Sequence, residues 1–85
     1  MELVFDKGVV KTLRKMQPKA AAALMARLEA IAADPSRTHA NVTALQGLAN
    51  VFRLRQGDWR AVYELDRKAG VMRVVKIGQR GQVYR

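Results

Sequence analysis

Hydrophobic and polar residues alternate along residues 51–65, which read VFRLRQGDWRAVYEL. The dipeptide Gln56-Gly57 interrupts the alternation, and glycine readily takes the positive φ that a tight turn needs. The stretch therefore predicts a β-hairpin with Gln56-Gly57 as its loop. In such a hairpin, cross-strand partners share one face of the sheet. The predicted pairs are Arg55 with Asp58, Leu54 with Trp59, Arg53 with Arg60, and Phe52 with Ala61.

This register sorts the hairpin side chains into two faces. One face is apolar and is expected to face the core; it consists of Phe52, Leu54, Trp59, Ala61 and Tyr63. The other face carries Arg53, Arg55, Arg60, Asp58, Glu64 and Val62. A one-residue slip would bury guanidinium groups, so the sorting is well specified. Arginines on one face repel each other unless an anion lies between them, so this face predicts a phosphate site. Asp58 and Glu64 are expected to hold the arginines in place by bidentate pairing.

The first half of the chain has helical periodicity. A short β run over residues 2–5 is followed by Asp6 as the expected N-cap, and apolar residues then recur at helical spacing to about residue 17. Pro18 suits the first turn of a second helix, which is expected to continue to Ala33 through strong helix formers. The tight break at Gln17-Pro18 predicts an antiparallel helix pair whose joint apolar stripe needs a sheet to cover it.

The remaining segments complete the expected topology. Residues 36–50 lack a clean period and are expected to form a polar loop, whereas residues 71–77 predict an internal strand covered on both faces. The element order is β-α-α-β-β-β within one domain, residues 1–85. We therefore expect an α+β fold: a small, mainly antiparallel sheet with the N-terminal helix pair on one face and a basic surface on the other.

Composition narrows the range of partners. The 85 residues have a formal net charge of +9, and nine of the 16 Lys and Arg residues lie in residues 51–85, which favours an anionic partner such as nucleic acid. With no cysteine and a single histidine, neither a metal site nor a cofactor is expected. The sequence shows no signal segment and no apolar run long enough to cross a bilayer, so we expect a cytoplasmic protein with no membrane partner.

Some residues that could take part in binding or catalysis have simpler interpretations. Phe52, Trp59 and Tyr63 lie on the expected core face and are interpreted as core residues rather than base-stacking platforms. His39 lies in the expected polar loop and is kept only as a reserve candidate for a general base.

Three segments, in this order and spacing, resemble RelE-like toxins of bacterial type II toxin–antitoxin systems, which belong to the RelE/ParE superfamily. They are LQGL at residues 45–48, VFRLRQGDWRAVYEL, and VVKIGQRGQVYR at residues 74–85. The resemblance implies a ribosome-dependent mRNA endoribonuclease, or mRNA interferase, that cuts messenger RNA in the decoding site without metal and inhibits translation. It also implies neutralisation by a RelB-like antitoxin, which the basic charge predicts to be acidic. DNA contact is expected only through the antitoxin complex.

The resemblance also implies a set of catalytic residues. Basic residues on the strand before the hairpin turn are matched by Arg53 and Arg55. The arginine of a G-x-[YW]-R-x-V-Y segment is matched by Arg60, and the basic residue of a later G-x-R motif is matched by Arg80. Tyr84 matches the tyrosine of the terminal V-Y.

Cleavage of RNA by its own 2′-hydroxyl needs a proton acceptor, cations for the phosphorane and an acid for the leaving oxygen. Arg60 and Arg80 suit the non-bridging oxygens, while Arg53 and Arg55 orient the phosphate. In the best-described nuclease of the family, lysines occupy the positions of Arg53 and Arg55. Because a guanidinium stays protonated and is a poor general base, the general base is unassigned. Two roles are open to Tyr84: stacking on a base, or accepting the proton.

Two other functions are compatible with the sequence. One is a ParE-like toxin that binds DNA gyrase and has no ribonuclease activity, and the other is a non-catalytic basic module that binds nucleic acid. The arginines and Tyr84 together favour the nuclease. A gyrase binder needs no phosphate-and-phenol site, and a plain binding module usually exposes aromatic residues for stacking.

Overall fold

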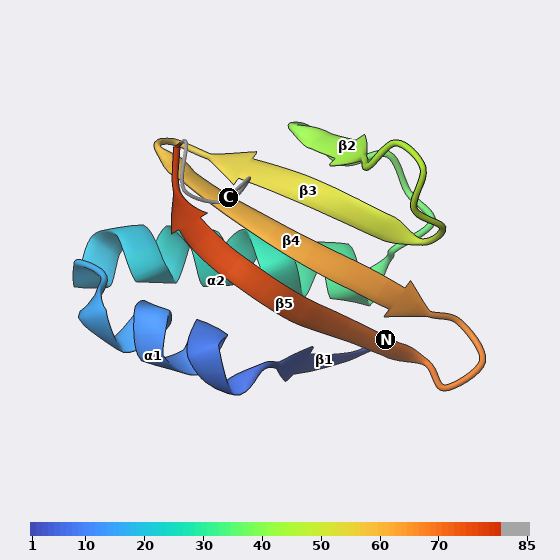
Figure 1. Cartoon of the computed structure of the whole chain (residues 1–85), viewed down its shortest axis with the longest axis horizontal. Coiled ribbons are helices and arrows are strands. Elements are labelled where there is room, and N and C mark those ends of the chain that lie inside the picture. Colours follow the sequence, from blue (N-terminus) through green and yellow to red (C-terminus); the bar gives the residue numbers. More distant parts are fainter. Residues whose placement is uncertain (81–85) are drawn as a thin grey trace.

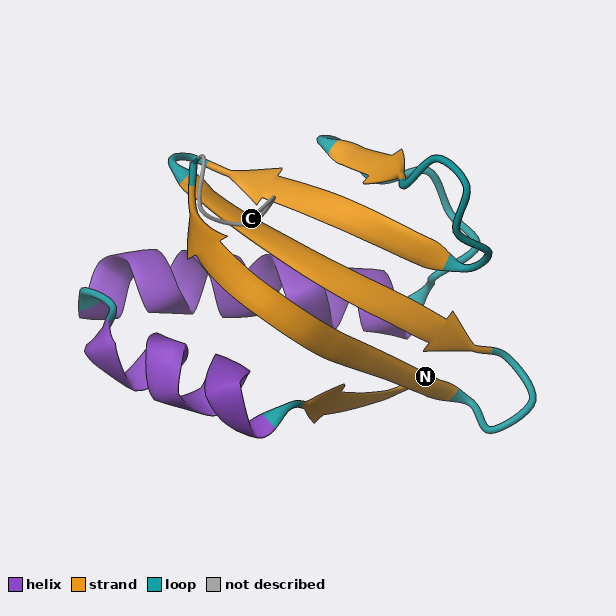
Figure 2. Cartoon of the chain, in the orientation of Figure 1, coloured by secondary structure: helices purple, strands orange, loops and turns teal. Residues whose placement is uncertain are grey.

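A five-stranded sheet with two helices on one face forms the protein, as the computed structural model of residues 1–80 shows (Figures 1 and 2). The sheet order is β1-β5-β4-β3-β2. Strand β1 pairs with β5 in parallel, and the other three pairings are antiparallel. The elements are β1 Glu2–Phe5, α1 Lys7–Lys15, α2 Pro18–Ala33, β2 Val42–Ala44, β3 Val51–Gln56, β4 Trp59–Asp66 and β5 Val71–Gln79. The expected α+β class and mainly antiparallel sheet are confirmed.

The two helices form the expected antiparallel pair against one side of the sheet, which we call the inner face (Figure 1). Pro18 stands in the first turn of α2, where its missing N–H has no helical partner to lose. Leu24, Leu28 and Ile31 lie one turn apart on α2 and are almost completely buried. They pack in one cluster with inner-face residues of the sheet, so the period read from the sequence identified the core-facing stripe correctly.

The start of α1 differs from the prediction in detail. Asp6 is the N-cap residue, but its side chain makes no capping hydrogen bond. Its carboxylate instead lies 3.1 Å from Nε of Arg73 on β5. The parallel pairing of β1 with β5 brings the two residues together, and the Asp6 carboxylate pairs with Arg73 instead of capping the helix.

The loop of the β3–β4 hairpin is Gly57-Asp58, one residue later than predicted. Gly57 has a φ of 60°, and a type II′ hairpin turn places glycine first in its two-residue loop. Gln56 therefore belongs to the strand and pairs with Trp59, so each predicted partner is wrong by two residues. Because side chains alternate with a period of two, this shift leaves the predicted sorting into two faces intact.

The segment from residue 36 to residue 50 contains strand β2, which the sequence pattern did not predict. Its three residues pair with β3 at the edge of the sheet. Two of the three are exposed, so the segment has no alternation that would have distinguished it from a loop. Its strand geometry depends on hydrogen bonding to β3.

Strand β5 lies inside the sheet as expected, but it is not covered on both faces. Arg73 and Lys76 are exposed on the side away from the helices, which we call the outer face. The two residues are three apart and would point to opposite faces in a regular strand. A register irregularity opposite Val62/Tyr63 adds one residue to β5 and brings both cations to the outer face.

Candidate functional site

The outer face of the sheet gathers the cations in successive cross-strand rows. In the row nearest the β3–β4 turn, Arg55 on β3 lies opposite Arg60 on β4, and Gly78 on β5 follows Arg60. In the next row, Arg53 lies opposite Val62, and Lys76 follows on β5. Four cationic side chains from three strands therefore share one face within two neighbouring rows.

Arg60 and Arg80 both bond to the hairpin turn. Nη1 of Arg60 donates to the main-chain oxygens of Gly57 and Trp59, at 3.0 and 3.1 Å. The main-chain N–H of Arg80 donates to the carbonyl of Asp58 at 2.9 Å, which brings the end of β5 against the same turn. Two arginines that are twenty residues apart in the sequence are thus held at one end of the sheet.

Arg55 is oriented by the segment that precedes β2. Its Nη2 donates to Oδ1 of Asn41 at 3.3 Å, and its main-chain N–H donates to the Asn41 carbonyl at 2.9 Å. Asn41 has a φ of 62°, a left-handed conformation that asparagine tolerates better than most residues. Arg27 of α2 donates to the carbonyl of Ala40 and, at 3.3 Å, to Oε1 of Gln56. These contacts connect α2 to the strand that carries Arg53 and Arg55.

The structure brings four of the five predicted site residues to one region: Arg53, Arg55, Arg60 and Arg80. The fifth, Tyr84, lies outside the described residues. Sequence reasoning missed Lys76, because residues 71–77 were interpreted as a strand covered on both faces. Arg73 and Lys76 are three residues apart in an apolar run. Because residues on one face of a regular strand are an even number apart, two cations at this spacing are the sequence signal for a bulge and an exposed face.

The expected pairing of Asp58 and Glu64 with the hairpin arginines is wrong in its details. Glu64 lies opposite Arg73, and Oε1 of Glu64 is 3.9 Å from Nε of Arg73. Asp58 contributes to the site through its main-chain carbonyl, which accepts the hydrogen bond from Arg80. The two-residue change in register places Asp58 in the turn and puts Arg60, a second cation, opposite Arg55. Positive charge is therefore more concentrated at the turn than the sequence predicted.

The aromatic residues of the hairpin lie on the inner face, as predicted. The Phe52 and Tyr63 rings stack with centroids 5.4 Å apart, and Trp59 packs against the core. Burial raises the pKa of the Tyr63 hydroxyl to about 12, although the positive charge of Arg27 acts in the opposite direction. The Tyr63 hydroxyl is therefore neutral at neutral pH, and it lies on the opposite face of the sheet from the arginine rows.

The reserve candidate His39 lies away from the arginine rows. Its Nε2 donates to the carbonyl of Asp34 at 2.7 Å, and its side chain lines a hollow together with Phe52 and Tyr63 of the inner face. The sheet therefore separates His39 from the outer-face cations. Among residues 1–80, no three His, Asp or Glu side chains are grouped so that they could hold a metal ion.

Neither helix of the described chain is long and apolar enough to cross a membrane. The family model for the ParE toxin of type II toxin–antitoxin systems (parDE) matches residues 3–84. The chain therefore belongs to this family of toxins, within the RelE/ParE superfamily. No curated protein sequence matches the chain significantly.

Solved structures of RelE toxins share the fold. The isolated E. coli RelE toxin is 26% identical, with a TM-score of 0.80 over 98% of this chain and 89% of that one. The RelE–RelB complex from Pyrococcus horikoshii is 25% identical, with a TM-score of 0.81 over 95% and 96% of the two chains. The intact E. coli RelBE toxin–antitoxin complex is 26% identical, with a TM-score of 0.79 over 95% and 98%. The protein is a type II toxin of this superfamily.

Proposed function

We propose that this toxin is a ribosome-dependent mRNA endoribonuclease that inhibits translation. The observation that carries the proposal is the direct opposition of Arg55 and Arg60 on the outer face, with Arg80 bonded to the same turn. Two opposed guanidinium groups, with a third arginine bonded through its main chain to the same turn, favour a bound phosphate, since each guanidinium presents a planar fork of donors. The similarity in fold to RelE toxins supports the same interpretation.

The proposed reaction is an in-line attack of the RNA 2′-oxygen on the adjacent phosphorus. The new bond joins the 2′-oxygen to phosphorus, the bond from phosphorus to the 5′-oxygen breaks, and the leaving oxygen takes up a proton. Arg60 and Arg80 neutralise the charge that develops on the non-bridging oxygens. Arg53 and Arg55 orient the phosphate, and Lys76 adds positive charge in the second row.

The arginines act through charge and position rather than as proton acceptors, because a guanidinium stays protonated at any ordinary pH. The proton of the 2′-hydroxyl therefore goes to another group. Tyr84 retains its two proposed roles, as a stacking surface for a base or as the proton acceptor. A Tyr84→Phe variant distinguishes them: retained cleavage supports stacking, whereas a large loss supports the phenol.

The proposed partners are the ribosome, its messenger RNA and an acidic antitoxin, which places the toxin in the cytoplasm. Some of the matching solved structures contain RelE together with the antitoxin RelB. The net charge of +9 on this chain suits an acidic partner that relieves repulsion among the arginines. DNA contact is proposed only through the antitoxin. Co-expression with the adjacent open reading frame should yield a complex and relieve growth arrest, and failure of both would contradict this part of the proposal.

A gyrase-binding toxin is the second candidate, and the match to the ParE family model favours it. The outer-face cations favour the nuclease instead, since binding to gyrase needs no convergent phosphate site. Primer extension on messenger RNA in a translating extract separates the two. Discrete, codon-phased stops that require the toxin support the nuclease. Inhibition of DNA supercoiling by purified gyrase, with no new stops in the messenger RNA, would support the alternative.

A further inference from the structure

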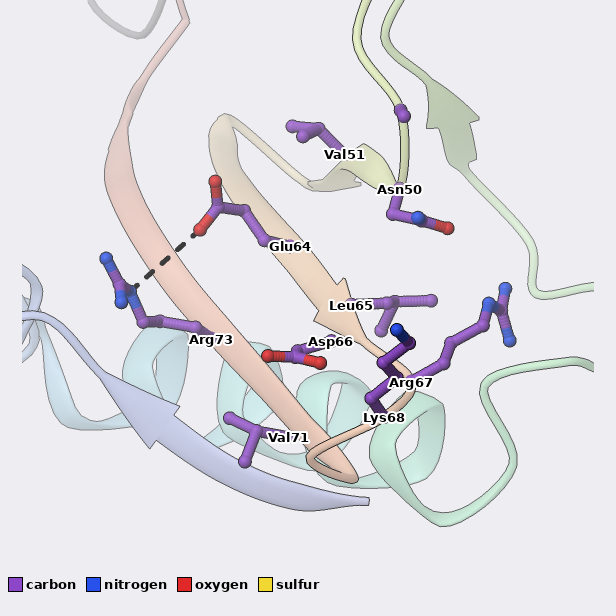
Figure 3. Close-up of a pocket in the computed structure, with 10 residues that line it drawn as sticks. Asn50, Val51, Glu64, Leu65, Asp66, Arg67, Lys68, Val71 and Arg73 are labelled. Atoms are coloured by element: carbon purple, nitrogen blue, oxygen red, sulfur yellow. Dashed lines mark ion pairs between the residues drawn. The ribbon is translucent and has the colours of Figure 1, made fainter.

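A hollow of about 600 Å³ lies on the same outer face as the cation rows, at the opposite end of strands β3, β4 and β5 (Figure 3). Val51 and Glu64 form the third cross-strand row of this face, with Arg73 next to Glu64 on β5. The β4–β5 turn contributes Arg67 and Lys68 to the rim. The hollow therefore continues the surface on which the candidate site lies.

The register gives the separation between the hollow and the phosphate site. Successive rows on one face are two residues apart, or about 7 Å along a strand. Glu64 is one row beyond Val62 and two rows beyond Arg60. Glu64 is therefore about 14 Å from the Arg60 row, a distance that a single-stranded RNA following the strands covers in about two nucleotides.

The carboxylate of Glu64 lies beside a guanidinium group at this position. Arg73 lies between two acids, with Nε at 3.1 Å from Oδ1 of Asp6 and at 3.9 Å from Oε1 of Glu64. Figure 3 shows Glu64 and Arg73 joined across β4 and β5 beside Asp66. The Glu64 side chain is 48% exposed, so its carboxylate remains available to a ligand.

We propose that this hollow binds the base of a nucleotide within about two positions of the cleaved phosphate, and that Glu64 selects a base with an exocyclic amino group over uracil. This inference rests on the proposed nuclease function. A carboxylate repels phosphate but accepts hydrogen bonds from amino groups such as N4 of cytosine. Uracil presents carbonyl oxygens where cytosine presents its amino group, so it leaves the carboxylate without a donor at this position.

Charge favours RNA over an acidic antitoxin segment as the occupant of the hollow. The hollow contains two carboxylates, Glu64 and Asp66, which repel acidic side chains. A nucleotide instead offers a base to the carboxylates and phosphates to the cations Arg67, Lys68 and Arg73, all of which line the same hollow. This mixed arrangement suits a nucleotide with both kinds of group.

The test uses messenger RNA with randomised codons in a purified translation system, with 3′-end sequencing to map the cleaved positions. The wild-type toxin should prefer cytosine over uracil at one position within about two nucleotides of the cut. The Glu64→Gln variant should lose this preference by about 5-fold or more, within the range of one well-placed base contact. The amide has the same shape but carries donors as well as an acceptor, so it accepts uracil equally well.

The matched control is Glu29→Gln on α2, which removes another exposed carboxylate, from the helical side of the protein. This variant should keep the wild-type preference, and thermal unfolding should show both variants folded. Cleavage by the Glu64→Gln variant with unchanged base preference would overturn the inference while leaving the nuclease intact. Unchanged preference together with weaker neutralisation by the antitoxin would assign the hollow to the antitoxin. A wild-type toxin that produces no codon-phased cleavage would overturn the proposed function itself.

Discussion

Arg55 and Arg60 occupy directly opposite positions on the outer face of the β3–β4 hairpin. Like charges at opposed positions destabilise an antiparallel pair, so this arrangement lowers the stability of the folded protein in the absence of an anion. Hydrogen bonds compensate in part: Arg60 donates to main-chain carbonyls of the turn, and Arg55 donates to Asn41. In the proposed function, these hydrogen bonds hold the pair ready for a ligand with negative charge.

The first prediction concerns this repulsion. Arg55→Gln should raise the free energy of unfolding by about 0.2 to 1 kcal/mol at low ionic strength, because one of two opposed charges is removed. The gain should disappear in high salt, since exposed charges are then screened. Urea unfolding at low and high salt measures both effects.

Removing any cation from a chain of net charge +9 relieves some repulsion, so Lys19→Gln at the start of α2 is the matched control. The salt-dependent gain should be larger for Arg55→Gln than for Lys19→Gln. Equal gains would show that only the overall charge matters and that the opposed pair carries no specific repulsion.

The second prediction separates catalysis from binding. Arg60→Ala and Arg80→Ala should each lower single-turnover cleavage by roughly 100-fold or more, as expected when a preorganised donor to a developing anion is removed. Ribosome binding should change little. Lys11→Ala on α1 should instead weaken binding and reduce its salt dependence by about one unit of slope, with cleavage on the bound complex unchanged.

Cleavage measured with the ribosome saturated by variant protein tests this prediction. If excess Arg60→Ala or Arg80→Ala protein restores the full cleavage rate, the two arginines form only a docking surface and the site assignment is wrong.

The third prediction concerns Asn41, which combines a φ of 62° with a hydrogen bond to Arg55. Asn41→Ala should lower the free energy of unfolding by about 1 kcal/mol, because alanine is strained in the left-handed region. Asn41→Gly should be close to the wild type in stability, since glycine adopts this conformation readily. Both variants should cleave more slowly, because Arg55 loses the side-chain amide that orients it. Full cleavage by Asn41→Gly would show that the tether is dispensable.

The fourth prediction concerns alkaline pH. Burial raises the pKa of Tyr63 to about 12, whereas an unfolded tyrosine has a pKa of about 10. The unfolded chain therefore loses this proton first, so the contribution of Tyr63 to stability is fully present below about pH 10 and decreases as pH rises toward 12. The loss approaches about 2 to 3 kcal/mol.

Other groups titrate in the same range, so the measurement is the difference between the wild type and Tyr63→Phe. Urea unfolding of both proteins between pH 8 and pH 12 should show stability falling less steeply for Tyr63→Phe. Parallel curves would show that the hydroxyl is not shielded from water.

Local periodicity was enough to predict which side chains share a face of the sheet. Alternation with a period of two assigned Phe52, Leu54 and Tyr63 to the core and Arg53 and Arg55 to the opposite face. This assignment survived an error of two residues in the register, because an even shift preserves the face of every side chain. The apolar stripe on α2 was predicted equally well, since its period depends only on local geometry.

Which residues contact each other depends on how distant segments pair in the fold. The opposition of Arg55 and Arg60 depends on the position of Gly57 in the turn, and the exposure of Lys76 depends on an irregularity in the β4–β5 pairing. The contacts of Asn41 with Arg55 and of Asp6 with Arg73 join segments distant in the sequence. Such contacts come from strand pairing between remote segments, and local periodicity carries no information about which partner a strand will find or in what register.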